Sequence, residues 1–211
     1  MKNVLLLLFT LSLLSINAQT EWELKKEEEG ITAFTRSRDG IKFKEYKVIM
    51  EVEAGLNQAL ALLRDYEVYP DLFPGTRDHK VISDDFTHYI TYTRFKIPFP
   101  ARDRDGVFDN TLSFDKDSKT LRINVHCLDD EEHVNGKLVQ IKYCEGLWEI
   151  SDIGDGRIRV MNQMIVDPGG MAPAWIVNSK TVDDPIKTFK AFKHLIEDQK
   201  YQKSSFSLLS Q

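Results

Sequence analysis

The sequence predicts an α+β fold in which a curved antiparallel β-sheet wraps round one long C-terminal α-helix. Three observations predict it. Alternating apolar and polar residues, typical of half-buried strands, fill most of residues 31–166. The last such run stops at Pro168, Gly169 and Gly170, where the proline ends the ladder and the glycines allow a sharp reversal. Residues 186–196 then carry apolar side chains at helical spacing, and only the sheet remains to cover them.

The first part of the chain predicts a hairpin followed by a short helix. Residues 21–30 are charged and indicate a short helix or entry segment. Residues 31–38 form a strand that ends at Asp39-Gly40, a dipeptide typical of hairpin turns, and an alternating strand follows it. Residues 56–65 have the apolar spacing of an amphipathic helix. Residues 66–75 are too rich in proline for a regular element and predict a turn-rich cap.

Further strand patterns bring the expected sheet to roughly seven to nine strands. These patterns cover residues 80–83, 86–97, 106–114, 121–127, 139–150 and 157–166. The final helix is expected to begin near Ala172, with Pro173 in its first turn, and to reach about Gln202. Pro185 is expected to break or kink it, with Asp183 and Asp184 capping the second segment. This order of elements is the helix-grip arrangement, whose curled sheet encloses either a filled core or a cavity.

The two ends of the chain predict a cleaved leader and a loose tail. Residues 1–18 combine the basic Lys2, an apolar run and the small residue Ala18, as a secretory signal peptide does. The alternative, a membrane anchor, needs about 20 apolar residues, more than this run has. We therefore expect export to the periplasm or the extracellular space, one domain over residues 22–202, and a frayed tail over 203–211.

Composition and motifs exclude several classes of function. The chain has 28 basic and 33 acidic residues, a net charge of −5, and its basic residues are scattered, so nucleic acid is not an expected partner. No glycine-rich phosphate loop or nucleophile elbow occurs. The five histidines fall on separate elements without metal-ligand spacing. We expect neither a metal nor a cofactor.

Two amide side chains are expected on apolar strand faces. Alternation places Asn110 beside Phe108 and Leu112, and places Asn162 beside Met164. One interpretation is that these amides contact a polar head group or trapped water. The commoner alternative is that they bond to each other or to neighbouring backbone, because buried amides need partners.

Charged residues near the middle of the chain have two interpretations. Tyr92 and Arg94 share one face of a strand that has no clear apolar side. Arg94 could anchor a polar group in a cavity, although a surface position is commoner for arginine. The segment from Arg102 to Asp105 alternates positive and negative charges, which predicts a local ion-pair network with a structural role.

The two cysteines predict a disulfide. A two-residue hairpin turn at Asn135-Gly136 would place Cys127 directly opposite Cys144, with Cα atoms about 4.5 Å apart. The same register sets Ile123 opposite Trp148, apolar on apolar. The acidic residues before the turn are poor strand formers, so a longer loop with another register is the alternative. An oxidising compartment would favour the bond.

Three groups of residues together resemble the START (steroidogenic acute regulatory protein-related lipid transfer) domain family, within the Bet v 1-like SRPBCC superfamily. The resemblance covers residues 22–200. It is carried by Pro98-Phe99-Pro100 leading into Asp103-Arg104-Asp105, by Gly146-Leu147-Trp148-Glu149-Ile150, and by Asp167-Pro168-Gly169-Gly170 followed by Pro173, Trp175 and Asn178.

The resemblance implies a deep apolar tunnel for one lipid, closed by the C-terminal helix and neighbouring loops, without a cofactor. Trp148, Trp175 and Asn178 match positions on or beside the tunnel and its lid. Arg104 and Asp105 match an Arg-Asp pair with a mainly structural, ion-pairing role. The family's ligands include sterols, phospholipids, ceramides and pigments. The expected activity is therefore non-enzymatic carriage of a single hydrophobic ligand.

The residues expected at the lipid are Tyr92, Arg94, Asn110, Trp148, Asn162, Met164, Trp175 and Asn178. Gly169-Gly170 and Pro185 are candidate hinges of the lid. We further expect a monomer that makes passing contact with a membrane.

Two other classes stay open. An enzyme of this fold, cyclase-like or hydrolase-like, would need an acid/base pair facing the cavity, for which His88 and His126 are the candidates. An interaction protein would have a filled interior.

Overall fold

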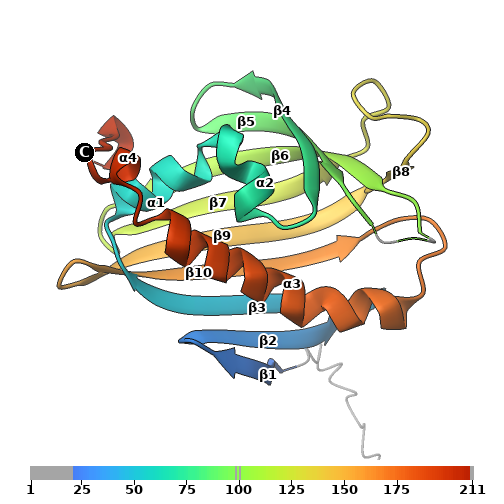
Figure 1. The fold of residues 1–211 in the computed structure, drawn as a ribbon, viewed down its shortest axis with the longest axis horizontal. Helices are drawn as coiled ribbons and strands as arrows, with labels where there is room; N and C mark the ends of the chain where they lie inside the picture. Colours follow the sequence, from blue (N-terminus) through green and yellow to red (C-terminus); the bar gives the residue numbers. More distant parts are fainter. Residues whose placement is uncertain (1–20, 98, 100, 210–211) are drawn as a thin grey trace, which may run out of the picture.

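A computed structural model describes residues 21–97, 99 and 101–209, and it has the predicted α+β helix-grip architecture (Figure 1). Residues 1–20, which include the predicted signal peptide, lie outside the described residues, as do Pro98, Pro100 and residues 210–211. The strands are β1 (Glu23–Glu28), β2 (Ile31–Arg38), β3 (Ile41–Glu53), β4 (Thr76–Asp84), β5 (His88–Phe95), β6 (Arg104–Asp115), β7 (Thr120–Leu128), β8 (Val139–Gln140), β9 (Tyr143–Gly154) and β10 (Arg157–Asp167).

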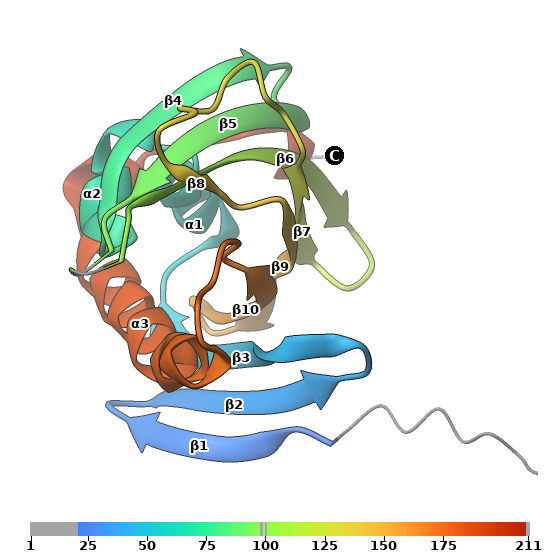
Figure 2. The same cartoon turned by 90° about the vertical axis from the view of Figure 1, so that its right-hand side faces the viewer.

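One curled sheet contains all of these strands (Figure 2). Its order is β1-β2-β3-β10-β9-β7-β6-β5-β4, with antiparallel neighbours throughout, and the short β8 pairs in parallel with β6. The charged stretch before Gly30 is strand β1 rather than the helix or entry segment expected. Its exposed charged side chains suit an edge strand, because they discourage pairing with other chains.

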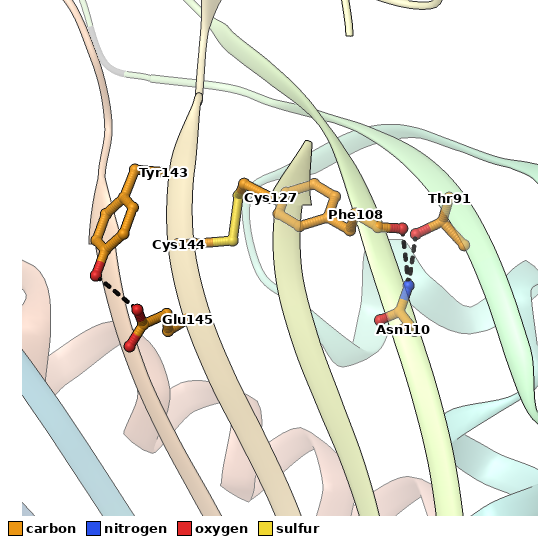
Figure 3. The surroundings of a disulfide bond; sticks show 7 residues. All are labelled: Thr91, Phe108, Asn110, Cys127, Tyr143, Cys144 and Glu145. Carbon is orange, nitrogen blue, oxygen red and sulfur yellow. Dashed lines mark hydrogen bonds between the residues drawn. A yellow bond between two sulfur atoms is a disulfide. The ribbon is translucent and has the colours of Figure 1, made fainter. Parts of the chain in front are cut away.

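The predicted register of β7 against β9 is confirmed, although the predicted turn is wrong. Ile123 lies opposite Trp148, as the sequence indicates. The strands are joined not by a two-residue turn but by residues 129–142, which include β8. Cys127 and Cys144 nevertheless form the predicted disulfide, with Cα atoms 5.0 Å apart (Figure 3). The register follows from apolar side chains meeting across the strands, so it does not depend on the turn.

The helical elements are α1 (Leu56–Leu63), η1 (Tyr66–Val68), α2 (Tyr69–Leu72), α3 (Ala174–Leu195), α4 (Gln199–Gln202) and η2 (Ser207–Leu209). The proline-rich segment predicted to be irregular therefore contains two short helical turns, η1 and α2. Proline is tolerated in α2 because Pro70 lies in its first turn, where an N–H has no partner. Within the described residues, no helix is both long enough and apolar enough to cross a bilayer.

Pro185 was predicted to break or kink the last helix; the break does not occur, because the 22-residue helix α3 continues through Pro185. Pro185 is buried, and Ile186 and Phe189 beside it are buried against the sheet. This packing offsets the cost of about 3 kcal/mol that an interior proline carries. Asp184 is consequently no cap; its carboxylate pairs with Lys187 at 2.9 Å.

The two halves of α3 have different environments. In the C-terminal half, Phe189 and Phe192 stack on Trp148 with ring centroids 5.8 and 6.3 Å apart, and this aromatic group is the centre of the core. The N-terminal half covers the open side of the curled sheet (Figure 1). The sheet therefore holds a solid core under one end of α3 and leaves space under the other.

The part of the tail that the structure describes, residues 203–209, contacts the rest of the domain. The Phe206 ring lies 5.6 Å from that of Phe86, and the Phe206 N–H donates to Asn57 Oδ1 at 2.8 Å. Leu208 and Leu209 pack against the core. The apolar residues of the tail thus add to the core rather than hanging free in solvent.

Candidate functional site

A cavity of about 420 Å³ lies between the concave face of the sheet and the N-terminal half of α3. This volume falls in the range of small-molecule sites, about 300–1,000 Å³. Aromatic and aliphatic side chains form most of its wall. They are Tyr46, Leu63, Tyr69, Phe73, Tyr89, Phe95, Ile97, Phe108, Ile123, Val125, Ile141, Trp148, Met164, Val166 and Val177. The interior is therefore hollow at this end, which disfavours the filled interior of the interaction-protein alternative.

The curled sheet and α3 supply most of this wall. Strands β5, β6, β9 and β10 line it with the residues of their concave faces, and α3 closes it with Val177, Thr181 and Thr188. These α3 positions recur at helical spacing, so they form one stripe of the helix. The segment from Tyr69 to Thr76 completes the roof. The expected turn-rich cap thus belongs to the site.

Both predicted amides line the cavity, and both bond to backbone and neighbouring side chains, as the commoner alternative expects. Asn110 Nδ2 donates to the Phe108 carbonyl oxygen at 3.0 Å and to Thr91 Oγ1 at 3.4 Å (Figure 3). It also donates to the Tyr89 carbonyl oxygen at 3.2 Å. Asn110 is only 8% exposed. These bonds hold the amide nitrogen away from any ligand.

Asn162 is held in the same way from the opposite wall. Its Oδ1 accepts from the Tyr46 hydroxyl at 2.8 Å and its Nδ2 donates to the Leu147 carbonyl at 3.2 Å. Burial raises the pKa of Tyr46 well above its ordinary value, so the phenol stays protonated and donates. The two amides polarise the wall without placing a charge there.

Trp148 and Met164 also line the cavity, but Tyr92 and Arg94 do not. On β5 the odd-numbered residues, such as Thr91 and Thr93, face the cavity, so the even-numbered ones lie on the opposite face. There Tyr92 and Arg94 lie beside residues 133–135 of the β7–β9 connection. An arginine at the surface was the alternative that the sequence left open.

Trp175 and Asn178 lie at the beginning of α3 and outside the cavity wall. Trp175 is 74% exposed to solvent. Asn178 Oδ1 accepts a hydrogen bond of 2.9 Å from the backbone N–H of Lys44 on β3. Asn178 therefore ties the N-terminal half of α3 to the sheet.

The predicted ion pairing of Arg104 and Asp105 is wrong for the described residues, since neither side chain meets an opposite charge within 4.0 Å. Arg104 Nε donates to the Pro168 carbonyl at 3.3 Å. Asp105 Oδ2 accepts from the Tyr92 hydroxyl at 3.2 Å. The local ion pairs form instead at Asp103, which lies 2.8 Å from Arg94 and 3.8 Å from Arg77.

Sequence reasoning missed the basic residues of the cavity wall, Lys44, Lys96 and Lys180, and assigned Arg104 to an ion pair. They come from β3, from the β5–β6 connection, from β6 and from α3. Lys44 lies two residues from the inward-facing Tyr46, and residues at that spacing share a strand face, so Lys44 is the member that the sequence could have predicted.

The geometry offers no histidine acid/base pair for catalysis. Of the described residues, no histidine lines the cavity. His126 is exposed, and His88 Nε2 lies 2.8 Å from Asp109 Oδ1 in an exposed pair. No group of three or more His, Cys, Asp or Glu side chains in the described part of the chain is placed to hold a metal.

His79 supports the cavity wall from behind and makes stability depend on pH. Its ring stacks on that of Tyr69 at 3.8 Å, and its Nδ1 lies 2.8 Å from Thr93 Oγ1. Burial lowers the pKa of His79 to about 4 from an ordinary 6.5, against the smaller opposite effect of Asp78. The unfolded chain therefore takes up the proton first, and stability falls as pH drops from about 6.5 to about 4.

We expect His79→Gln to remove part of this acid sensitivity. Because the ring is partly exposed, the loss that His79 causes in the wild type is about 1–2 kcal/mol. Urea unfolding at neutral pH and near pH 4.5 measures it as the difference between wild type and variant. His88→Gln, a change at an exposed histidine, is the control. Equal pH dependence in all three proteins would contradict the assignment.

Comparisons with known proteins agree with this geometry. No family model matches the chain. It is 27% identical over 179 residues to an uncharacterised protein of Pseudomonas aeruginosa, covering 84% of this chain and 87% of that protein. It is 24% identical over 168 residues to the rat phosphatidylcholine transfer protein, covering 75% of each.

Solved structures share the fold. A STAR-related lipid transfer protein of Xanthomonas axonopodis superposes with a TM-score of 0.78 at 24% identity, over 84% of this chain and 99% of that one. A Streptomyces aromatase/cyclase superposes with a TM-score of 0.51 at 11% identity, over 72% of this chain and 93% of that one. The chain thus has the fold of START-related lipid transfer domains, and the resemblance stated from the sequence is confirmed.

Proposed function

We propose that this chain binds one hydrophobic ligand of the lipid class in the cavity beneath α3 and carries it without changing it chemically. The observation that carries the proposal is the apolar cavity of about 420 Å³ in a fold shared with lipid transfer domains. Each methylene that enters the cavity contributes about 0.8 kcal/mol, so an acyl chain supplies the binding energy. The names of the rat and Xanthomonas relatives support lipid as the ligand class.

The N-terminal half of α3 is the lid in this proposal. It covers the cavity with Val177 and Thr181, whereas the C-terminal half is anchored in the core through Phe189 and Phe192. Pro185 lies between the two halves and lacks the N–H that would bond to the preceding turn. A pivot at this position opens the cavity while the anchor stays in place.

The second hinge is the turn before α3. Gly169 has a φ of +69°, and a Cβ there would lie 2.6 Å from the Gln140 carbonyl oxygen. Only glycine fits this backbone conformation and this close approach. The turn therefore fixes where the lid begins, next to β8.

The bond from the Lys44 N–H to Asn178 is the latch that the lid must break. Asn178→Ala is expected to speed ligand release by about fivefold, because one hydrogen bond contributes about 1 kcal/mol. Stopped-flow release of a fluorescent fatty acid measures the rate. Ser179→Ala is the matched control, since the Ser179 hydroxyl donates to the Ile176 carbonyl of its own helix. Equal release rates in the two variants would contradict the latch.

Loading from a membrane is the second part of the proposal. Four large apolar side chains are exposed at the cavity end of the molecule: Phe99 at 96%, Met171 at 99%, Trp175 at 74% and Ile176 at 44%. They come from the β5–β6 connection, the turn before α3 and the first turn of α3, which lie at one end of the sheet (Figure 1). Tryptophan is enriched at membrane–water interfaces, so Trp175 beside these exposed apolar side chains is suited to contact a membrane surface.

We place the protein outside the cytoplasm. The disulfide between Cys127 and Cys144 supports this, because such bonds persist in oxidising compartments. The apolar run of the first 18 residues supports it independently.

Native mass spectrometry of the protein purified from its host, with organic extraction of what is bound, tests the proposed function. A lipid in equimolar amount is the expected result. A mass equal to the bare polypeptide, with no uptake from a mixed lipid extract, would overturn the proposal and favour a small polar substrate.

A further inference from the structure

The cavity wall carries a positive charge that the chain as a whole does not. Lys44, Lys96, Arg104 and Lys180 line it, and Asp184 is the acidic residue among the described wall residues. The Asp184 carboxylate forms an ion pair with Lys187, with Oδ1 2.9 Å from Nζ. The whole chain has a net charge of −5, so the positive wall is a local feature.

Arg104 is the member of this group that the fold buries. It is only 7% exposed. Its Nε donates to the Pro168 carbonyl oxygen at 3.3 Å, and its Nη1 donates to the carbonyl oxygen of Arg102. Within the described residues, no carboxylate lies within ion-pair distance of it. Burying a cation without a counter-charge is costly, so an anion that enters the cavity recovers part of this cost.

Burial lowers the pKa of the Arg104 guanidinium, and the charge of Arg102 acts in the same direction. Arginine nevertheless stays protonated in proteins, so the cavity wall keeps this positive charge at every physiological pH.

The basic residues lie at the lid end of the cavity rather than at its aromatic floor. Arg104 pairs across the sheet with Phe95, the residue before Lys96. Lys44 bonds through its N–H to Asn178 at 2.9 Å, two residues before Lys180 on α3. The exposed apolar side chains Met171 and Trp175 are at this same end. The floor, by contrast, is formed by Trp148 under the anchored half of α3.

We propose that the ligand is an anionic amphiphile whose phosphate or carboxylate head is held by Arg104, with Lys44, Lys96 and Lys180 around it, and whose tail points toward Trp148. This inference rests on the proposed function. The planar guanidinium donates in a fork that matches both kinds of head group. The lysines supply positive charge that attracts the anionic head group to the lid end of the cavity.

A ligand series with one oleoyl tail and different heads tests the inference. Oleate and oleoyl lysophosphatidate are the anionic members, monoolein is the neutral member, and inorganic phosphate alone has the head without a tail. Dissociation constants are measured by displacement of a fluorescent fatty acid. We expect both anionic amphiphiles to bind about tenfold more tightly than monoolein, and phosphate alone to displace nothing.

Three variants test which residues cause the preference for anionic amphiphiles over monoolein. Arg104→Gln is expected to remove most of the tenfold difference, because the anionic heads lose the guanidinium and monoolein has no charge for it to hold. Lys96→Gln combined with Lys180→Gln is expected to weaken the preference without a risk to folding, because both lysines are exposed. Arg102→Gln is the matched control, since it removes the same charge from an exposed neighbour that does not line the cavity.

The outcomes separate the inference from the proposed function. Equal affinity of the wild type for all three amphiphiles overturns the anionic head group and leaves lipid binding intact. An unchanged preference in both the Arg104 and the double lysine variants also overturns it. Binding of none of the amphiphiles overturns the proposed function itself. If inorganic phosphate alone displaced the fluorescent fatty acid, the inferred ligand would be a free anion rather than an anionic amphiphile, which overturns the inference.

Discussion

Replacing Thr181 by tryptophan is expected to lower lipid affinity by about 100-fold or more. Thr181 is half-buried on the cavity-facing stripe of α3, and its hydroxyl donates to the Val177 carbonyl of its own helix at 3.2 Å. An indole in this position occupies space that an acyl chain would fill. If it displaces about four methylenes, the loss is about 3 kcal/mol, which corresponds to about 100-fold.

Lys193→Trp is the matched control, because Lys193 is exposed on the same helix and does not line the cavity. It introduces the same indole with the same helix propensity but leaves the cavity empty. Displacement of a fluorescent fatty acid and native mass spectrometry measure loading, and thermal unfolding shows that both variants fold. A fully loaded Thr181→Trp protein would show that the ligand does not occupy the cavity beneath α3.

Local rules were sufficient to predict most of the fold from the sequence. Strand alternation, the Asp39-Gly40 turn and the amphipathic spacing of residues 186–196 are short-range patterns, and each is found in the structure as an element of the predicted type. The β7–β9 register was predictable because apolar side chains such as Ile123 and Trp148 must meet on the buried face.

The errors in the fold arose where tertiary packing outweighs local propensity. Pro185 remains inside α3 because its neighbours Ile186 and Phe189 are fully buried. The charged β1 is a strand because β2 offers it an edge to pair with. Neither contact is visible from residues close in sequence.

The site was harder to predict than the fold, because it depends on which face of each strand turns inward. On β5 both faces are mixed, so the sequence could not decide between Tyr92 with Arg94 and Thr91 with Thr93. The structure places the threonines in the cavity. The basic group round Arg104 comes from separate elements, and only the closed sheet brings its members together.

Removing the disulfide is expected to destabilise the protein by about 3 kcal/mol, the usual contribution of a bond that closes a loop of about 15 residues. Cys127 and Cys144 are 17 residues apart in the sequence. Urea unfolding of the Cys127→Ala, Cys144→Ala double variant measures the loss. The wild type in reducing buffer is expected to match the variant, and the variant itself is expected to be insensitive to the reductant. A loss well below 1 kcal/mol would contradict the structural role of the bond.

The same change is expected to weaken lipid binding, because the bond joins two strands of the cavity wall. Cys127 pairs across the sheet with Phe108, and Cys144 pairs with Val166, both of which line the cavity. Loosening β7 from β9 frees these two side chains, so the cavity must be ordered again when ligand enters. A protein reduced in the cytoplasm would therefore be both less stable and a poorer lipid binder than one oxidised after export. If the reduced wild type bound the fluorescent fatty acid as tightly as the oxidised form, the bond would serve stability alone.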